Sequence, residues 1–571
     1  MSKSTKTRTS NRSAKKASVV RKPAGVVKHA PARKEEKAAK IPRPAPAPVR
    51  SKGSCLLLHD GTAIMAAGLP AMAELLRKHG YDCDICNYFC ERRYGLAPSI
   101  EEDIRGYDIL GLSIHWFYQI PSALEAARRA RNASKKVFIV AGGLTASAYP
   151  EELLAHAGEI DGVIRGDGEL PLLKLCGEIA SGRRRFDAVP NLYVAGKGGK
   201  VTRSTARDYV GETSSLDKLA FGNLTALRNW HYYVHTSSWR EITDGSPDIA
   251  FDIDTTFYLC GGRGCSVQCV TCGGGKESHK LHSMRSKSFI FRSPARIADD
   301  IEAAMRHGYR SFHACFDPAP GGRHWLEVMR VVRKRKIETN FIFECFALPS
   351  EKFIREARGT FMNTVLVLSP DTAVEKLRKK AKGFFYTNAQ LEKCLELIGR
   401  SGLRAQVFYG YFLPGDDEAA VEQTLAAIDA IQRRHGDYTG VFYYPFSSDP
   451  CSPVVLAPEA HGMRGMVKTF EDYGRELAAE EPLRGNLLRH TPAGKEPAEW
   501  DLLSLRIELE RACGRRLPSL AADIRSTLKD RTPAFYRSLA EKLAATKDIR
   551  TLPRATLHEH VLHHYSRYTQ P

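Results

Sequence analysis

The strongest constraint on the fold is a repeated alternation of short apolar runs with amphipathic helical segments. The first series begins at Gly53 and places runs such as SCLLLHD and KKVFIVAGG between helical segments such as PSALEAARRARNAS. Several of the runs are almost continuous Val, Ile and Leu, which is typical of parallel strands buried on both faces. The pattern predicts a doubly wound parallel α/β sheet over residues 53–212, with a ligand site beyond the carboxyl ends of its strands.

A second series of the same kind starts at Ile253. Six strand candidates, from TTFYL to TGVFYYPF, are separated by amphipathic helical segments. This spacing predicts a (β/α)6 partial TIM-like barrel over residues 253–460, again with its site at the strand carboxyl ends. Residues 213–252 are expected to connect the two domains, and residues 461–571 to form a helical C-terminal region.

The net charge of +20 belongs mostly to one end of the chain. Residues 1–52 hold 16 Lys and Arg against 2 Glu. Such a segment has too little apolar surface to offset its ordering entropy, so we expect a disordered basic tail. A solubilising extension is the simplest role. Contact with nucleic acid or another anionic surface and an organelle-targeting peptide are the alternatives.

The cysteine content and the hydropathy pattern bear on the compartment. No run approaches 18 uninterrupted apolar residues, and the first thirty residues lack the apolar core of a secretory signal. Neither a transmembrane helix nor export is therefore expected. Fourteen cysteines without an export signal favour a reducing, cytoplasmic environment and thiolate ligation over a disulfide framework.

Three cysteines follow the first strand of the predicted barrel. Cys265, Cys269 and Cys272 form a C-x-x-x-C-x-x-C pattern in a glycine-rich segment. Three thiolates this close can hold a [4Fe–4S] cluster with one iron left open to a substrate or cofactor. A zinc site that adds Cys260 or His279 is the alternative, although their spacing does not follow the usual zinc patterns.

The motif and its position resemble the radical S-adenosylmethionine (radical SAM) superfamily. The resemblance covers residues 253–455 and implies that Cys265, Cys269 and Cys272 are the ligands of a [4Fe–4S] cluster. In that family the open iron binds S-adenosylmethionine. One electron, from a donor such as flavodoxin or ferredoxin, then cleaves it to a 5′-deoxyadenosyl radical that abstracts hydrogen from an unactivated carbon.

The same resemblance implies S-adenosylmethionine contacts at the ends of later barrel strands. The turn CFDPAPGG would meet the methionine amine, LSPDT its carboxylate or the ribose, and GYFLPGD the adenine. Many members carry an aromatic residue where this chain has Thr271, so Val270 or a residue elsewhere would supply that contact. The residues implied are Asp317, Ser369, Asp371, Leu413 and Gly415.

A second group of cysteines has a different interpretation. Cys83, Cys86 and Cys90 lie on or just after the second strand of the first sheet, with no glycines around them. Alternation along a strand sends Cys83 and Cys86 to opposite faces, and buried free cysteine behaves as a small hydrophobic residue. We expect structural cysteines, with an auxiliary iron–sulfur cluster as the alternative.

The first sheet resembles the cobalamin-binding domain of cobalamin-dependent radical SAM enzymes. The segments VAGGLTASAYPEELL and VIRGDGELPLLKL carry the resemblance. The first loop reads HDGTAIMAAG, in which His59 is out of register with D-x-H-x-x-G, so no histidine ligand to cobalt is expected, and Ile64 or Met65 would face the metal. A sheet for another nucleotide is the alternative, weakened by the lack of G-x-G-x-x-G. The residues implied are Asp60, Ile64, Met65, Ser113, Gly142, Gly143, Gly166 and Glu169.

Together these features predict a cobalamin-dependent radical SAM enzyme. By resemblance it would methylate an unactivated carbon of a small-molecule or lipid substrate, using a [4Fe–4S] cluster, S-adenosylmethionine and cobalamin. A cyclase or rearrangase without methyl transfer would use the same residues. A nucleic-acid-associated protein held by the tail of residues 1–52, and a cofactor-binding sensor without turnover, are the remaining hypotheses.

Overall fold

The computed structural model divides the chain at Arg50, and everything described here belongs to the unit Ser51–Pro571. The predicted basic tail, apart from Lys52, and most of the predicted C-terminal helical region lie outside the described residues. The described residues are 52–62, 64–93, 95–206, 213–236, 256–283, 287–315, 322–411, 413–464, 467–478 and 491–492.

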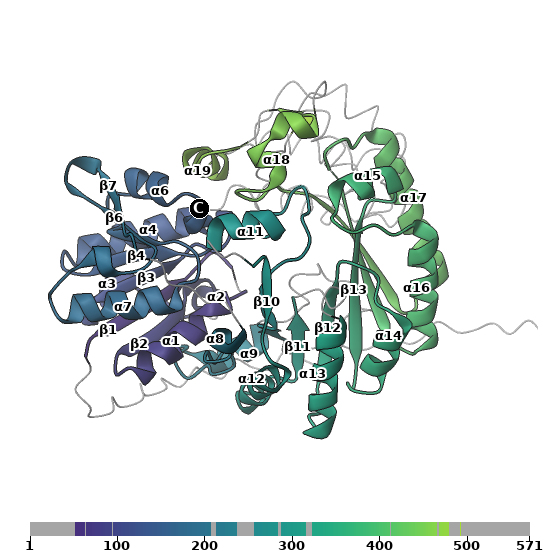
Figure 1. Ribbon diagram of the computed structural model, residues 1–571, viewed down its shortest axis with the longest axis horizontal. Coiled ribbons are helices and arrows are strands. Elements are labelled where there is room, and N and C mark those ends of the chain that lie inside the picture. The colour runs from purple at the N-terminus through teal and green to yellow at the C-terminus, as the bar shows by residue number, and fades with distance from the viewer. Residues whose placement is uncertain are drawn as a thin grey trace, which may run out of the picture. The chain divides into compact units, whose positions relative to one another are not determined.

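The first sheet has seven strands in the order β2-β1-β3-β4-β5-β6-β7 (Figure 1). The strands β1 to β5 are parallel, which confirms the doubly wound sheet, and the order reverses between β1 and β3, where such sheets bind ligands. Their bounds are β1 Ser54–His59, β2 Asp82–Asn87, β3 Ile109–Ser113, β4 Phe138–Gly142, β5 Gly162–Ile164, β6 Leu192–Ala195 and β7 Val201–Arg203.

Two antiparallel strands at one edge were not predicted. Strand β6 pairs antiparallel with β5, and β7 with β6. The turn between β6 and β7 places Gly198 at φ 71° and Gly199 at φ 78°, a conformation that glycine adopts without strain. The pair therefore ends the parallel sheet with a short hairpin.

Helices cover both faces of this sheet. Alternate residues of β1 enter different cores: Leu57 packs with residues of α1 and α7, and Leu56 with residues of α4 and α6. The helices are α1 Gly68–Lys78, α2 Tyr88–Arg93, α3 Ile100–Asp103, α4 Ile120–Ala133, α5 Leu144–Ala148, α6 Pro150–His156 and α7 Glu169–Ala180.

The second sheet has six parallel strands in the order β15-β14-β13-β12-β11-β8. Within the described ranges no pairing joins β8 to β15, so the predicted partial barrel is confirmed. The strands are β8 Thr256–Leu259, β11 Ser311–Ala314, β12 Asn340–Cys345, β13 Thr364–Asp371, β14 Arg404–Tyr411 and β15 Thr439–Pro445. The helices are α12 Pro294–Arg306, α13 Gly322–Lys334, α14 Glu351–Arg358, α15 Glu375–Ala381, α16 Asn388–Arg400 and α17 Glu418–His435.

The predicted connecting segment, where described, contacts both domains. It includes α8 Thr213–Leu216 and α9 Trp230–Thr236. Arg228 pairs with Asp103 of the first domain at 2.6 Å, while Asp300 of α12 accepts hydrogen bonds from the backbone of Phe221 and Gly222. These buried polar contacts hold the segment against both neighbours.

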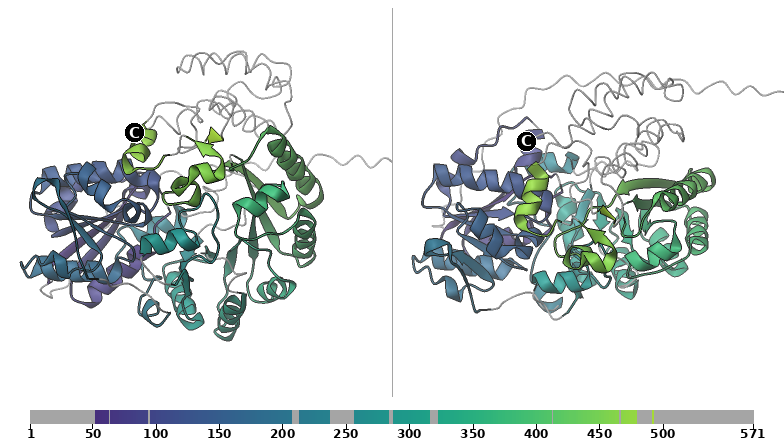
Figure 2. Two further views of the ribbon diagram at one scale, coloured as in Figure 1. Left: turned by 45° about the horizontal axis from the view of Figure 1, so that its top comes forward. Right: turned by 90° about the horizontal axis from the view of Figure 1, so that it is seen from above.

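After the barrel the chain returns to the first sheet. Helix α19 Phe470–Ala478 contacts α4 and α6, and both views of Figure 2 show it in yellow-green beside the blue helices of the first domain. Its Phe470 and Tyr473 are buried in the apolar core on that side of the first sheet. The remaining short elements are α11 Lys276–Ser283, α18 Pro453–Leu456, β9 Gly262–Gly264, β10 Phe289–Phe291, β16 Met463–Arg464 and β17 Thr491–Pro492.

Candidate cofactor and substrate cavity

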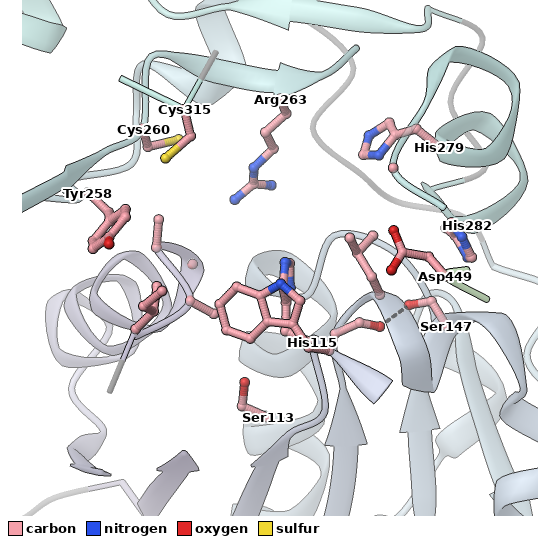
Figure 3. A pocket seen from close by; sticks show the side chains of 18 of the residues that line it. Ser113, His115, Ser147, Tyr258, Cys260, Arg263, His279, His282, Cys315 and Asp449 are labelled. Atoms are coloured by element: carbon pink, nitrogen blue, oxygen red, sulfur yellow. Dashed lines mark hydrogen bonds between the residues drawn. The ribbon is translucent and has the colours of Figure 1, made fainter. Parts of the chain in front are cut away.

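A cavity of about 1050 Å³ is bounded by both sheets and by the segment that carries the cysteine triplet. Ser113 at the end of β3 and Gly142 at the end of β4 line it from the first sheet, and Ser369 of β13 lines it from the barrel. Ser113 and His115 lie on one side, whereas Cys260 and Arg263 lie on the opposite side (Figure 3). The carboxyl ends of both sets of parallel strands thus face one space, as the sequence predicted for each separately.

All but one of the residues expected to bind cobalamin line this cavity. Asp60 is the exception. Its Oδ1 accepts a hydrogen bond from the amide of Gly61 at 2.7 Å and pairs with Arg92 at 2.5 Å. The residues that do line the cavity are Ile64, Met65, Ser113, Gly142, Gly143, Gly166 and Glu169.

His59 has a structural position. Its Nε2 lies 2.9 Å from the carbonyl oxygen of Ile64, and its Nδ1 lies 3.3 Å from Oγ of Ser113. Burial lowers the pKa of the imidazole to about 4, so it is neutral at neutral pH. It therefore holds the loop after β1 against β3 and is not among the cavity-lining residues.

Gly143 and Gly166 act through close backbone packing. A Cβ on Gly143 would lie 2.6 Å from the carbonyl carbon of Ile114 and 2.7 Å from the amide nitrogen of His115, and its φ is 109°. Gly166, with φ 84°, donates its N–H to Oγ of Ser147 at 2.9 Å. These glycines let the strand-end loops of the first sheet approach one another closely.

Glu169 takes part in an ion-pair cluster with Arg263 and Asp167. Nη1 of Arg263, on β9, lies 2.9 Å from Oδ1 of Asp167 and 3.1 Å from Oε2 of Glu169. All three side chains are largely buried, and Arg263 also lies 5.8 Å from the ring centre of Phe221. The cluster fixes the β5–α7 loop to the base of the cysteine loop.

The cysteine triplet lies on a loop closed by the unpredicted hairpin of β9 and β10. At its base Gly264 pairs with Phe289, and the amide of Cys265 donates to Ser288. Further along, the amide of Val270 donates to the carbonyl oxygen of Ala381 at 2.8 Å, and its carbonyl oxygen accepts from Val454. The barrel therefore holds the loop at both its base and its middle.

The donor chemistry of this loop fits an iron–sulfur cluster. The amides of Val267 and Gly274 donate to the sulfurs of Cys265 and Cys272 at 3.3 Å, the kind of hydrogen bond that tunes cluster ligands. Burial and the neighbouring Asp449 carboxylate raise the pKa of Cys272, and burial raises the pKa of Cys269 to about 11. The thiols would therefore lose protons on ligation.

The cluster assignment itself remains a prediction. Cys272 lines the cavity, whereas Cys265 and Cys269 do not. In the part of the chain that is described, no three Cys, His, Asp or Glu side chains are gathered closely enough to hold a metal ion.

The residues assigned to S-adenosylmethionine fall in three places. Ser369 and Asp371 line the cavity; Asp371 has φ 64° and pairs with Lys382 at 3.1 Å. Leu413 is buried in an apolar cluster with Val270, and neither Leu413 nor Gly415 is a lining residue. Asp317 lies outside the described residues. These roles also stay predictions.

Several cavity residues were missed at the level of sequence. Tyr258 and Cys260, and likewise His313 and Cys315, stand two positions apart along consecutive strands of the barrel sheet, so period-2 alternation could have revealed that they share a face. His115, Trp116, Ser147, Arg263, His282, Glu344 and Asp449 also line the cavity and carried no comparable signal. Cys260 and His279 had been considered only as ligands of the alternative zinc site, and His279 lines the cavity as well.

A polar group lies at the barrel side of the cavity. Nε2 of His313 is 3.0 Å from Oε1 of Glu344, and the rings of His313 and Tyr258 are 5.2 Å apart. Near the cysteine loop, Asp449 accepts a hydrogen bond from the amide of Gly273 at 3.1 Å, and burial raises its pKa to about 6. The lining therefore combines apolar walls with a few convergent polar groups, as is typical of ligand sites.

The other cysteine group is structural, as predicted. Cys83 and Cys86 are buried in the cores on opposite faces of the first sheet. Cys90 is buried on α2, with its amide bonded to Oδ1 of Asn87 at 3.1 Å. Burial raises the pKa of Cys86 well above its usual value. These thiols act as core side chains.

Comparisons with known structures agree with this architecture. The radical S-adenosylmethionine methyltransferase TsrM from Kitasatospora setae, with cobalamin and a [4Fe-4S] cluster bound, is similar over 80% of this chain and 90% of its own, at 16% identity and a TM-score of 0.58. The cobalamin-dependent S-adenosylmethionine radical enzyme OxsB, with aqua-cobalamin bound, covers 90% of this chain and 80% of its own, at 12% identity and a TM-score of 0.55. The chain has the fold of the cobalamin-dependent radical SAM enzymes.

Sequence comparisons extend the match to particular parts of this radical SAM fold. Residues 53–175 match the family model of the B12 binding domain. The hopanoid C-3 methylase of Methylococcus capsulatus is 29% identical over 280 residues, 48% of this chain and 47% of that protein. The anaerobic magnesium-protoporphyrin IX monomethyl ester cyclase of Rubrivivax gelatinosus is 22% identical over 193 residues, 34% of this chain and 30% of that protein. The matches span about half or less of these relatives.

The described part of the chain contains no helix that is both long and apolar enough to cross a bilayer.

Proposed function

We propose that this protein is a cobalamin-dependent radical SAM methyltransferase that acts on an unactivated carbon of a small-molecule or lipid substrate. The observation that carries the proposal is the shared cavity. Strand-end residues of the B12-type sheet, including Ser113 and Gly142, border the same space as Cys272 and Ser369 of the barrel. Two cofactors held by the two domains would therefore meet a substrate in one cavity.

Each part of the lining has a distinct task in this proposal. When bound, the cluster with S-adenosylmethionine would supply the radical and cobalamin the methyl group. Cys265, Cys269 and Cys272 would hold the cluster. Ser369 and Asp371, together with Asp317, would orient S-adenosylmethionine. The first-sheet residues named above would hold cobalamin, while apolar lining residues exclude water from a radical reaction.

A cyclase or rearrangase is the second candidate. It is favoured by the similarity to the Rubrivivax gelatinosus cyclase, which covers 34% of this chain. Methyl transfer is favoured by the longer match to a methylase, which covers 48%. The two functions would use the same residues. They differ in whether a methyl group is transferred to the product.

The compartment and partners follow from the same chemistry. Within the described part of the chain no disulfide joins two cysteines, which supports a reducing, cytoplasmic environment. The proposed radical chemistry would also need a one-electron donor such as flavodoxin or ferredoxin. Residues 1–52 lie outside the described structure, and their contact with nucleic acid or an anionic surface is a separate proposal. Deleting them would abolish polyanion binding and leave turnover intact if the tail alone makes that contact.

The decisive experiment combines cofactor content with isotope transfer. Protein purified without oxygen is expected to contain about four irons and, after incubation with hydroxocobalamin, about one cobalt per chain. Replacing Cys265, Cys269 and Cys272 with alanine should remove the iron, whereas alanine at Cys83, Cys86 and Cys90 should not. Unchanged iron in the first variant would overturn the cluster assignment.

Methyl-labelled S-adenosylmethionine separates the two candidate reactions. With a panel of candidate substrates and a reductant, label in the product would establish methyl transfer. Unlabelled product formed together with 5′-deoxyadenosine would exclude it and favour the cyclase. If the protein binds the cofactors but forms neither a product nor 5′-deoxyadenosine, the result would favour a cofactor-binding sensor over an enzyme.

A further inference from the structure

Four histidines line the cavity within the described residues, and they divide between its two sides. His279 and His282 come from α11 of the cysteine loop, and His313 comes from β11 of the barrel. Nε2 of His282 lies 3.1 Å from the carbonyl oxygen of Gly273, and that of His313 lies 3.0 Å from Glu344. His115 is thus the one cavity histidine, among those described, that the B12-type sheet supplies.

His115 stands where a ligand of that sheet would be held. It follows β3 by two residues, next to the point between β1 and β3 at which the strand order reverses. Figure 3 shows it on the same side of the cavity as Ser113, facing the barrel residues across the open space. A side chain here meets a cofactor from the face nearer the first sheet.

The backbone of His115 is fixed on both sides. Its amide donates to Oε1 of Gln119 at 2.9 Å, and Nε2 of Gln119 donates to the carbonyl oxygen of Asp60 at 2.6 Å. Its carbonyl oxygen accepts from Oγ1 of Thr145 at 3.2 Å, and Gly143 packs directly against its amide nitrogen. The loops after β1, β3 and β4 therefore together hold His115 in place. Asp60 does not line the cavity, but its backbone carbonyl oxygen supports Gln119 and so helps to position His115.

The imidazole of His115 is held by packing against a neighbouring ring, and its nitrogens are available to bind a ligand. It packs edge-on against the indole of Trp116, with ring centres 4.6 Å apart at 77°. Within the described part of the chain no hydrogen bond engages its ring nitrogens, unlike those of His59. A neutral imidazole has one ring nitrogen with the lone pair that a metal needs.

We propose that His115 supplies a nitrogen ligand to the cobalt of bound cobalamin. This inference rests on the proposed function, because it requires that the cavity bind cobalamin. It replaces the sequence-based expectation that cobalt has no histidine ligand and that Ile64 or Met65 faces it. The ligand would come from the loop after β3 and not from the loop after β1, where His59 is already bonded to Ile64 and Ser113.

Electron paramagnetic resonance of the Co(II) state tests this directly. The full-length protein is loaded with hydroxocobalamin, freed of excess by gel filtration and reduced by one electron. A coordinated nitrogen-14 splits each cobalt line into a triplet, and nitrogen-15 splits it into a doublet. Protein grown with nitrogen-15 histidine should therefore give doublets. Persistent triplets would assign the nitrogen to the benzimidazole of cobalamin and overturn the proposal.

Variants identify the histidine. His115→Ala should retain cobalamin but lose the nitrogen-15 doublet, and His279→Ala, across the same cavity, should keep it. His115→Gly with added nitrogen-15 imidazole should restore the doublet, which also excludes a folding defect as the cause of its loss. A doublet that survives in His115→Ala would show that another histidine is the ligand.

The experiment distinguishes a failure of the proposed function from a failure of the His115 proposal alone. If the unmodified protein retains no cobalt after gel filtration, the proposed function fails and the ligand with it. If cobalt is retained at about one per chain without any histidine splitting, the cofactor assignment stands and the His115 ligand alone is wrong.

Discussion

Single residues decide whether the loops of the first sheet can come together. Gly143 is the clearest case, because a side chain there would meet the backbone of Ile114 and His115 at 2.6–2.7 Å and would also require a φ of 109°. The sequence resemblance implied Gly143 as a cobalamin-binding residue. In the structure, the backbone of Ile114 and of the cavity histidine His115 takes the space that a side chain there would need.

Replacing Gly143 with alanine tests this role. We expect a loss of about 1–3 kcal/mol in the free energy of unfolding, from backbone strain, and weaker retention of cobalamin because the strand-end loops that line the cavity are forced apart. Urea unfolding and cobalt content after gel filtration measure the two effects. Gly158→Ala is the matched control, since a Cβ there meets nothing within 4 Å. Equal stability of both variants would contradict the packing argument.

His59 makes stability depend on pH. Its folded-state pKa of about 4 lies below the ordinary value of about 6.5, because burial disfavours the charged ring. Between these values the unfolded chain binds the proton and the folded chain does not, so stability falls as the pH falls from about 6.5 to about 4.

The expected slope from this one group approaches about 1.4 kcal/mol per pH unit in the middle of that window. His59→Gln removes the titrating group and can still donate to the carbonyl oxygen of Ile64, so its urea midpoint should fall less steeply on acidification. A variant whose midpoint falls as steeply as that of the unmodified protein would show that His59 does not contribute.

At the scale of elements, the βα alternation was enough to predict the two sheets. Strands such as β13 and β14 are eight residues long, mostly buried and built around apolar stretches, and the helices between them carry clear amphipathic faces. The hairpin of β9 and β10 escaped prediction because Gly262–Gly264 has no strand propensity. Its pairing with Phe289–Phe291 is a contact between segments separated by the whole cysteine loop.

The ion-pair cluster of Arg263, Asp167 and Glu169 is the contact by which that hairpin holds the first sheet. Arg263→Met keeps the length of the side chain but leaves two largely buried carboxylates without their cation. Breaking such a buried pair is expected to destabilise the protein by about 3–5 kcal/mol. Differential scanning calorimetry should show a lower transition, with the two domains beginning to unfold separately.

Two comparisons make the Arg263 prediction specific. Arg263→Met combined with Glu169→Gln should recover part of the lost stability, because one unpaired charge is removed. Arg333→Met breaks a more exposed pair with Glu356, 2.8 Å apart, and should change stability by less than about 1 kcal/mol. A loss in Arg263→Met no larger than in Arg333→Met would show that the cluster is not an important link.

For the whole molecule, the sequence placed two cofactor sites but not the fact that they share one cavity. The cysteine triplet and the strand-end glycines are local patterns, so they could be found without a structure. His115, Arg263 and Glu344 line the same cavity only because the domains pack together, and no spacing in the sequence predicts this arrangement. Leu413 is the opposite case, because the turn that contains it could be recognised in the sequence although Leu413 does not line the cavity. Its side chain is buried in an apolar cluster with Val270 of the cysteine loop.

Helix α19 packs the chain that follows the barrel back onto the first sheet. The ring of Tyr473 lies 5.6 Å from that of Phe117 and 5.8 Å from that of Tyr149, and its hydroxyl donates to the carbonyl oxygen of Ser448 at 3.1 Å. Ser448 precedes Asp449, which lines the cavity. The helix therefore connects the B12-type sheet to a cavity-lining loop of the barrel.

Removing this contact should loosen both domains together. We expect Tyr473→Ala to cost about 3–5 kcal/mol through a cavity in the core, and Tyr473→Phe about 1 kcal/mol through the lost hydrogen bond alone. Glu471→Ala, an exposed change on the same helix, should stay within about 0.5 kcal/mol. Hydrogen exchange would then show faster exchange in α4 and α6 of the first domain and also in residues 446–455 beside the cavity. Faster exchange confined to α19 would mean that the helix rests on the first sheet without coupling it to the barrel.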